Sequence, residues 1–434
     1  MSDSEFDLNM TTSTELNGEY QLQLNTLPVE VLVQIFSYLR TRQDLISCTR
    51  VSRSFYAAAV NPSLWKSLCH KVWKIKDNGD ESWISIYKKM FMDFGRYERC
   101  YSEIREAWDL IENYLKENCP NILAGLQEGA SEDELQDSET QFLDGKSLPN
   151  DYRCFLRIHN GEKFKSCGIL GETTISNHFK QEAILDINSS AKGYSSMVSG
   201  LRGCIPITFC REKNCGHFMA VTEEAGHTQG RVFWPSLENE NATFVGNMMH
   251  CFVIANSFTE WFTSHAYNMV KEKYPIVNGK IHPYKFASQH TSDNGITVRT
   301  ATCFLPELSC INPPRFFFTY RITISMDANC SKSASCTLAT RHWYITNAGS
   351  KKEEVHGNAV VGKYPIMTPS ARHDYVSCTT FSTPTGTMEG YYTFKFNYKK
   401  GTTNAIIAPI HFEAPLFELA SERLRRKKET FSNL

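Results

Sequence analysis

The sequence lacks the features that mark a membrane or a secreted protein. Its 434 residues contain no run of 18 apolar residues, so we expect no membrane span. The first 24 residues hold neither a basic segment nor an apolar one, so we expect no secretory signal. The 15 cysteines include no Cys-x-x-Cys pair, which argues against a zinc ribbon or a thioredoxin-type site. We therefore expect reduced thiols in the nucleus, the cytoplasm or both.

Excess charge and catalytic motifs are also missing. Lys and Arg total 46 against 47 Asp and Glu, so no general basic field favours nucleic acid as a partner. There is no Gly-x-x-x-x-Gly-Lys-[Ser/Thr], His-Glu-x-x-His or Gly-x-Ser-x-Gly motif, and no kinase signature set. No cysteine lies in a recognisable nucleophile context. We therefore expect no enzymatic activity, no metal and no cofactor.

What is present is a long chain with ample core material. Hydrophobic residues make up 41% and aromatic residues 12%, and the length predicts about three domains. In the first block, Leu27, Val31, Ile35 and Leu39 repeat every four residues, which indicates one helix with Pro28 at its start. A second helix is expected after Asp44 as its cap, and a third after Asn61.

Three short helices bury little surface, so they must be completed by something else. They either pack on the rest of this chain or dock on another protein. The series from Leu27 to Trp65 resembles an F-box, a family in which such helices bind the adaptor Skp1 of a cullin-RING ubiquitin ligase. The resemblance implies that the adaptor is contacted by Leu27, Pro28, Leu32, Ile35, Leu39 and Leu45. Some of these residues must also hold the three helices together, and the sequence does not separate the two roles.

The middle block mixes helical and strand patterns. After a helical stretch over 83–118, Ser131 and Glu134 form a capping-box signature for a further helix. The segment 148–161 predicts a short buried helix that ends at Asn160-Gly161, and strands are expected at 168–171, 204–209, 217–221 and 231–234, before a closing helix near 258–262. The segment 148–161 resembles the SMI1/KNR4 (SUKH) family, which implies a binding module without chemistry. We interpret His159 as a hydrogen-bonded packing residue rather than a catalytic one.

The third block alternates polar and apolar residues. The segments 318–324 and 392–398 each place aromatic or β-branched residues at every second position, which indicates half-buried antiparallel strands. Further short strands separated by turns, at 296–302, 343–346, 374–378 and 406–412, predict a β-sandwich. The strings 341–347, 360–366, 375–378 and 386–392 resemble an ApaG domain, which implies a fibronectin-III-like sandwich.

Two shorter segments invite a functional interpretation. Relatives with an ApaG domain often carry Gly-x-Gly-x-x-Gly before the Val-Val-Gly string, a proposed pyrophosphate loop; this chain has Gly357 and Gly362 but Ala359 in the middle. A methyl group there hinders phosphate approach, and no helix N-terminus follows, so a tight turn is the favoured interpretation. The basic cluster 423–428 fits a nuclear import signal or phosphate-contacting arm as well as a solvated chain end.

Together these patterns predict a multidomain chain with a short all-α F-box, an α+β SMI1/KNR4-like domain and an all-β ApaG sandwich. The expected boundaries are a disordered tail over 1–24, the F-box over 25–70, a helical linker over 71–100, the SMI1/KNR4-like domain over 101–270, the sandwich over 278–420 and a basic tail over 421–434. The expected function is the substrate-recognition subunit of a Skp1-cullin-F-box ubiquitin ligase that delivers an unknown protein target for degradation. The alternatives are a phosphate or nucleotide sensor in the ApaG domain, and a scaffold that delivers no target.

Overall fold

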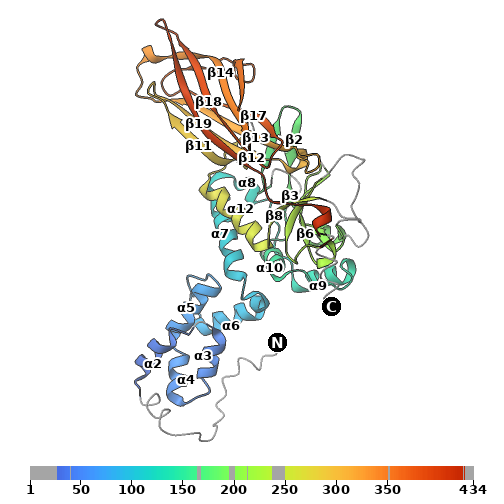
Figure 1. The fold of residues 1–434 in the computed structure, drawn as a ribbon. Coiled ribbons are helices and arrows are strands. Elements are labelled where there is room, and N and C mark those ends of the chain that lie inside the picture. The colour runs from blue at the N-terminus through green and yellow to red at the C-terminus, as the bar shows by residue number, and fades with distance from the viewer. Residues whose placement is uncertain are drawn as a thin grey trace. The chain divides into compact units, whose positions relative to one another are not determined.

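The structure is a computed structural model that describes residues 27–39, 41–163, 168–194, 201–212, 214–236, 250–349, 352–423 and 425. It divides into an N-terminal unit, Met1–Asp109, and a C-terminal unit, Leu110–Leu434, which we describe separately (Figure 1). The predicted tail over 1–24 lies outside the described residues. None of the helices in the described parts of the chain combines the length and the apolar character that a membrane crossing requires.

The N-terminal unit is built from short helices with side-chain caps. They are α2 (Val29–Phe36), α3 (Arg42–Cys48), α4 (Arg53–Ala59), α5 (Pro62–Val72), α6 (Trp83–Phe94) and the first half of α7 (Tyr101–Asn118). Asn61 caps α5 as predicted. The prediction that Asp44 caps the second helix was wrong: the Thr41 hydroxyl accepts the Asp44 N–H at 3.2 Å, so Asp44 is already the third residue of α3. Helix α4, capped by Ser52, was not predicted.

The segment predicted as a linker supplies much of this unit's core. The ring of Tyr87, on α6, is fully buried and contacts Trp65 of α5 and Trp73 directly after α5 edge to face, at centroid distances of 5.3 and 5.6 Å. The Tyr87 hydroxyl donates to Glu98 at 2.7 Å, and burial together with this carboxylate raises the pKa of Tyr87. The F-box helices are therefore completed in part by this chain's own residues beyond position 70, and their remaining exposed surface can be identified directly.

The middle part of the C-terminal unit is the predicted α+β domain. Its helices are α8 (Pro120–Leu123), α9 (Glu132–Phe142), α10 (Asn150–Ile158), α11 (Ile187–Lys192) and α12 (Phe258–Lys271). Its strands are β1 (Glu172–Ile175), β2 (His178–Gln181), β3 (Ala183–Ile184), β4 (Cys204–Pro206), β5 (Thr208–Phe209), β6 (Phe218–Ala220), β7 (Val232–Pro235) and β8 (Cys251–Ala255). The Ser131–Glu134 capping box is confirmed by both of its hydrogen bonds, at 2.7 and 3.1 Å. The prediction of a strand at 168–171 was wrong, because these residues form a turn that precedes β1.

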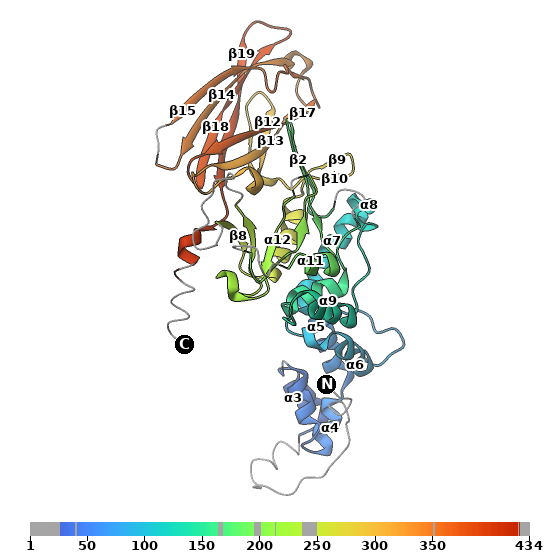
Figure 2. The same cartoon turned by 90° about the vertical axis from the view of Figure 1, so that its right-hand side faces the viewer.

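The sandwich consists of two antiparallel sheets, which Figures 1 and 2 show in yellow to red. One has the order β11-β12-β13-β17, from β11 (Lys285–Thr291), β12 (Ile296–Phe304), β13 (Phe316–Met326) and β17 (Arg372–Phe381). The other has the order β15-β14-β18-β19, with β16 also paired to β14, from β14 (Cys336–Asn347), β15 (Glu353–Asn358), β16 (Ile366–Met367), β18 (Thr385–Phe396) and β19 (Thr402–Glu413). The hairpin β9 (Ile276–Val277) and β10 (Lys280–Ile281) precedes them.

The two predicted alternations largely hold. Phe318, Tyr320, Ile322 and Ile324 of β13 are buried in the core between the sheets, together with Tyr392 and Phe394 of β18. Tyr398 is an exception, because β18 ends at Phe396 and the Tyr398 side chain is exposed in the following turn. The core is thus filled by the period-two residues that the sequence indicates.

The chain returns to the middle domain after the sandwich. Strand β20 (Phe417–Glu418) pairs with β8, so the sheet order there is β20-β8-β7-β6-β4. Arg423 is buried and its Nη1 lies 2.6 Å from Nε2 of His227. Arg423 therefore does not fit the predicted solvated or import-signal tail; Leu424 and the residues from Arg426 onward lie outside the described residues.

Candidate functional site

Helix α2 carries two neighbouring apolar stripes with different surroundings. Leu32 and Phe36, four residues apart, face the core and are buried. Val31 and Ile35 each precede one of these buried residues. Together with Pro28 directly before the helix and Tyr38 shortly after it, they follow a spacing of three or four residues. All four are exposed, with fractions of 41% for Val31, 42% for Ile35 and 78% for Tyr38. We call these four residues the α2 surface. A helix that is apolar on both stripes has more apolar surface than its own domain covers.

The structure divides the six predicted adaptor contacts. Leu32 and Leu45 are buried inside the unit, so they stabilise the helices. Pro28 and Ile35 are exposed, and Leu27 and Leu39 are half-buried. The contact assignment itself stays a prediction, but only these four side chains are accessible to a partner.

Two members of the α2 surface, Val31 and Tyr38, were absent from the predicted set. The signal that could have found them is their spacing from Ile35, at four residues before and three after.

In the segment 357–362, where a tight turn was favoured over a phosphate loop, the polar groups are bonded to other groups of the protein. The Ala359 N–H donates to the Ala339 carbonyl at 3.1 Å, and Val360 and Lys363 exchange both of their main-chain hydrogen bonds at 2.9 Å. The Arg341 guanidinium donates to the carbonyls of residues 358 and 359, at 2.7 and 2.8 Å. A Cβ atom on Gly357 would lie 2.7 Å from that guanidinium, and Gly362 has a φ of +72°. Packing and turn geometry thus explain both glycines without an anion.

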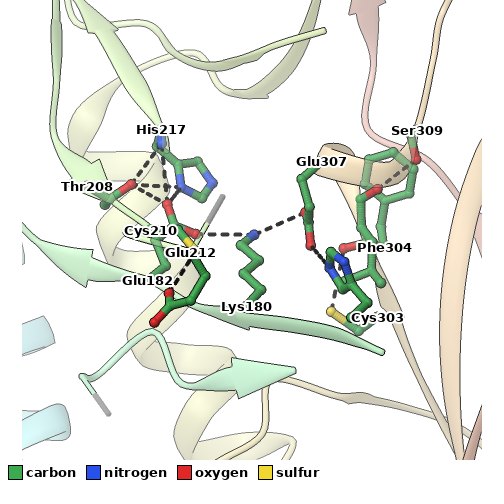
Figure 3. A network of polar contacts seen from close by, with 12 residues as sticks. Lys180, Glu182, Thr208, Cys210, Glu212, His217, Cys303, Phe304, Glu307 and Ser309 are labelled. Carbon is green, nitrogen blue, oxygen red and sulfur yellow. Dashed lines mark hydrogen bonds and ion pairs between the residues drawn. The ribbon is translucent and has the colours of Figure 1, made fainter. Parts of the chain in front are cut away.

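A buried polar network joins the middle domain to the sandwich (Figure 3). Its centre is Lys180 of β2, whose Nζ lies 3.2 Å from a Glu182 carboxylate oxygen and 3.3 Å from one of Glu307. Glu307 lies in a short 3-10 helix (Pro306–Leu308) of the sandwich and also contacts His178 Nε2 at 3.1 Å. Burial alone would lower the pKa of Lys180, but the two carboxylates outweigh it and raise that pKa. Lys180 is therefore a fixed cation rather than a nucleophile.

The other end of the network holds Glu182 on the middle domain. Its carboxylate accepts the Thr208 hydroxyl and lies 2.5 Å from Nδ1 of His217. Burial would raise the pKa of Glu182, but His217 and Lys180 outweigh it and lower that pKa. The pKa of Glu307 is lowered in the same way, chiefly by Lys180 against burial. Both carboxylates are thus held ionised, as partners of one cation.

A small cavity borders this network without offering chemistry. It measures about 160 Å³ and is lined in part by Trp261, His265 and Cys303. Burial lowers the pKa of His265 to about 4, and its Nε2 lies 3.1 Å from the Ile169 carbonyl, so the ring is neutral and donates there. Burial raises the pKa of Cys303 to about 12, so its thiol is not a nucleophile near neutral pH.

His159 packs as predicted, with its ring nitrogens 2.9 Å from the Gln127 carbonyl and 3.0 Å from Glu112.

One end of the sandwich carries a larger open groove. Its volume is about 580 Å³, and its lining is predominantly polar, from the segment 307–315, the end of β14 at Asn347 and the end of β17 at 380–382. Arg315 borders it, with a guanidinium nitrogen 3.4 Å from the Leu308 carbonyl. The groove has the size of a peptide or small-ligand site.

Comparison with known proteins identifies the family. Human F-box only protein 3 is 39% identical over 421 residues, which cover 95% of this chain and 88% of that protein. The chain belongs to the F-box only protein 3 family. In this chain, the F-box-like family model matches residues 24–71, the SMI1/KNR4 (SUKH-1) model matches residues 129–264 and the ApaG domain model matches residues 306–396. The three predicted domain types and their order are therefore confirmed.

More distant relatives match in whole or in part. The F-box protein SKIP16 of Arabidopsis thaliana is 24% identical over 395 residues, covering 79% of this chain and 87% of that protein. Protein ApaG of Shewanella pealeana is 42% identical over 98 residues, covering 23% of this chain and 75% of that protein. The sandwich thus resembles a bacterial protein that consists largely of this one domain.

Proposed function

We propose that this F-box family protein is the substrate-recognition subunit of a Skp1-cullin-F-box ubiquitin ligase. The α2 surface carries this proposal, since it leaves apolar side chains exposed on a helix whose other stripe already fills the core. Membership in a family named for its F-box supports the same assignment. In this scheme the α2 surface binds the Skp1-type adaptor, and the C-terminal unit presents a protein target to the ligase.

The proposed role requires no catalytic group from this chain. Holding the target near a ubiquitin-charged enzyme raises its effective concentration, which is a contribution of position alone. Three thiols agree with this, because desolvation raises the pKa of Cys204 and Cys215, as of Cys303, to about 12. The buried cation Lys180 is held between carboxylates. The protein thus acts by binding, with the chemistry left to the other subunits.

For target binding we propose the groove at the end of the sandwich. Its open shape, polar lining and main-chain groups at strand ends suit an extended peptide segment. The ApaG loop over 357–362 is a weaker candidate for any ligand, because Arg341 already occupies its carbonyls. A phosphate or nucleotide sensor at that loop has no observation in its favour.

The adaptor contact can be tested with the exposed residues alone. We expect Val31→Asp with Ile35→Asp to abolish co-purification of a Skp1-type adaptor. Covering the exposed two fifths of each wild-type side chain gives roughly 1 kcal/mol, and each new carboxylate adds a desolvation cost. A combined loss of about 3 kcal/mol weakens binding about 100-fold. Leu32 is unsuitable for this test, because its side chain is fully buried and a charge there would unfold the unit.

The matched control is Met92→Asp, on α6 of the same unit. Met92 is also apolar and is 55% exposed, but it lies outside the predicted F-box contacts. We expect this variant to retain the adaptor. Retention by the folded double variant would refute the adaptor assignment. A complex that binds the adaptor but transfers no ubiquitin to any co-purified protein would indicate a scaffold instead of a substrate receptor.

A further inference from the structure

Three potential metal ligands meet on the outer face of the sandwich. His342 of β14 pairs directly with His356 of the edge strand β15, and Glu354 lies two residues before His356. Side chains two residues apart on a strand share a face, so all three point to the same side. Trp343 and Val355, which alternate with them, belong to the core between the sheets. The cluster therefore lies on the face of β14 and β15 that points away from the core.

His342 is the buried anchor of this cluster. It is only 4% exposed, since it stacks on Tyr391 of β18 at a centroid distance of 4.8 Å and contacts the His356 ring at 3.7 Å. Its Nε2 lies 2.6 Å from a Glu354 carboxylate oxygen, but neither ring nitrogen has a partner in hydrogen-bond geometry among the described residues. A buried imidazole without hydrogen bonds is costly unless something else satisfies it.

The other two ligands are accessible. Glu354 and His356 are exposed, and His356 Nε2 lies 4.0 Å from the same Glu354 oxygen that faces His342. One ligand atom from each of the three residues lies within 4.8 Å of the other two. A single Glu354 oxygen faces both rings, at 2.6 Å from His342 Nε2 and 4.0 Å from His356 Nε2, so it does not satisfy both imidazoles at once. One shared cation satisfies both imidazoles and the carboxylate together.

We propose that His342, Glu354 and His356 bind one divalent cation of the zinc class. Two imidazole nitrogens and one carboxylate oxygen form a ligand set that suits Zn²⁺, with bonds of about 2.0–2.2 Å. The two exposed side chains adjust by rotation, while stacking holds His342 in place. Solvent access leaves a fourth position for water or for a side chain of a partner. The cation then links the edge strand β15 to β14.

A second cluster on the chain shows what excludes a cation. His227, Cys251 and Glu418 also bring three ligand atoms together. There, however, the Arg423 guanidinium lies 2.6 Å from His227 Nε2, and Arg231 lies 2.8 Å from Glu418. Two guanidinium groups thus already lie against two of the three ligand residues, so a cation bound there would meet fixed positive charge. At the sandwich cluster, the neighbouring Lys352 is instead paired with Glu389 at 2.9 Å.

The test measures zinc binding where it should act, on strand β15 of the full-length protein. Amide hydrogen exchange of residues 353–358 is followed by mass spectrometry with and without Zn²⁺. If zinc binds only when β15 is paired, it slows exchange by a factor of one plus the ratio of free zinc to Kd. This factor is about ten when the free zinc concentration is ten times Kd. This local readout separates the proposed site from any binding of zinc to cysteines elsewhere.

His356→Ala is the informative variant, since an exposed side chain can be removed without disturbing the core. His411→Ala is its control, because His411 is an exposed histidine on β19 of the same sheet. We expect zinc to slow exchange over 353–358 in the wild type and in His411→Ala, but not in His356→Ala. Zinc that leaves the wild-type exchange unchanged, or that protects His356→Ala equally, overturns the proposal.

Discussion

Replacing Lys180 with methionine tests whether the buried network holds the C-terminal unit together. The substitution keeps an unbranched side chain, one heavy atom shorter, and removes the charge. It leaves Glu182 and Glu307, whose side chains are 5% and 2% exposed, without their shared cation. Each carboxylate retains one histidine, His217 or His178. The variant therefore creates two under-compensated buried charges rather than a cavity.

The size of the effect follows from burial. Removing one partner of a buried ion pair costs about 3–5 kcal/mol, and the remaining histidines place this case near 3 kcal/mol. The matched control is Lys352→Met, because Lys352 and Glu389 form an ion pair with both side chains about half exposed. Exposed pairs contribute about 0–1 kcal/mol. The two variants thus differ in burial while the chemical change is the same.

The assay is urea unfolding followed by tryptophan fluorescence at pH 7. A loss of about 3 kcal/mol lowers the urea midpoint by about 1–1.5 M for a slope of about 2–3 kcal/mol per M, whereas Lys352→Met changes it little. The pKa values of Glu182 and Glu307 are lowered in the folded protein. The free energy of folding that these two carboxylates contribute is therefore present above their ordinary pKa of 4.5, and it is lost as the pH falls through their pKa values in the folded state. The cost of Lys180→Met should therefore shrink below about pH 5. Equal midpoints for the two variants at pH 7 would refute the argument.

Two further predictions concern the middle domain. Burial raises the pKa of Glu162 to about 7 and outweighs the Ile184 and Ile169 N–H groups, whose hydrogen bonds to the carboxylate lower that pKa. The folded state therefore holds this proton more tightly than the unfolded state. The stability that this group contributes is full below about pH 4.5 and is lost as the pH rises through 7. Glu162→Gln should remove up to about 3 kcal/mol of that pH dependence. Urea midpoints that shift equally between pH 5 and pH 8 in the wild type and in Glu162→Gln would contradict this. Ser131→Ala should cost about 1 kcal/mol by removing the cap that accepts the Glu134 N–H, measured as a lower urea midpoint, whereas Ser131→Gly should cost only a few tenths.

The sequence was most informative where local patterns decide the structure. Asn61-Pro62 predicts the start of α5, and the alternation in 318–324 predicts β13 with its buried face. Helix α4 was missed because its run of alanines shows no apolar periodicity, although Ser52 is a good cap. The strand at 168–171 was predicted from a short apolar run, and short runs do not distinguish strands from buried turns.

The candidate sites depend on contacts that one-dimensional patterns do not contain. Lys180 and Glu307 are 127 residues apart, and only the packing of the two domains brings them together. His342 and His356 become neighbours only through the register of β14 with β15. The α2 surface is different, because its spacing is visible in the sequence once Leu32 and Phe36 are known to face inward. The sequence thus indicates the helix that we propose to dock, and the structure shows which of its side chains are exposed.

Besides apolar packing, main-chain pairing and the Lys180 network join the sandwich to the middle domain, and these two contribute differently. Strand β20 pairs with β8 through main-chain hydrogen bonds, which are insensitive to side-chain identity and permit a slip in register. The Lys180 network has a cation that must meet two carboxylates at once, so it is satisfied in one arrangement only. Buried ion pairs contribute little net stability relative to apolar packing, but a misplaced one is costly. Under the proposed function, in which the protein acts by holding a target in place, we interpret the network as the element that fixes how the sandwich is oriented on the middle domain.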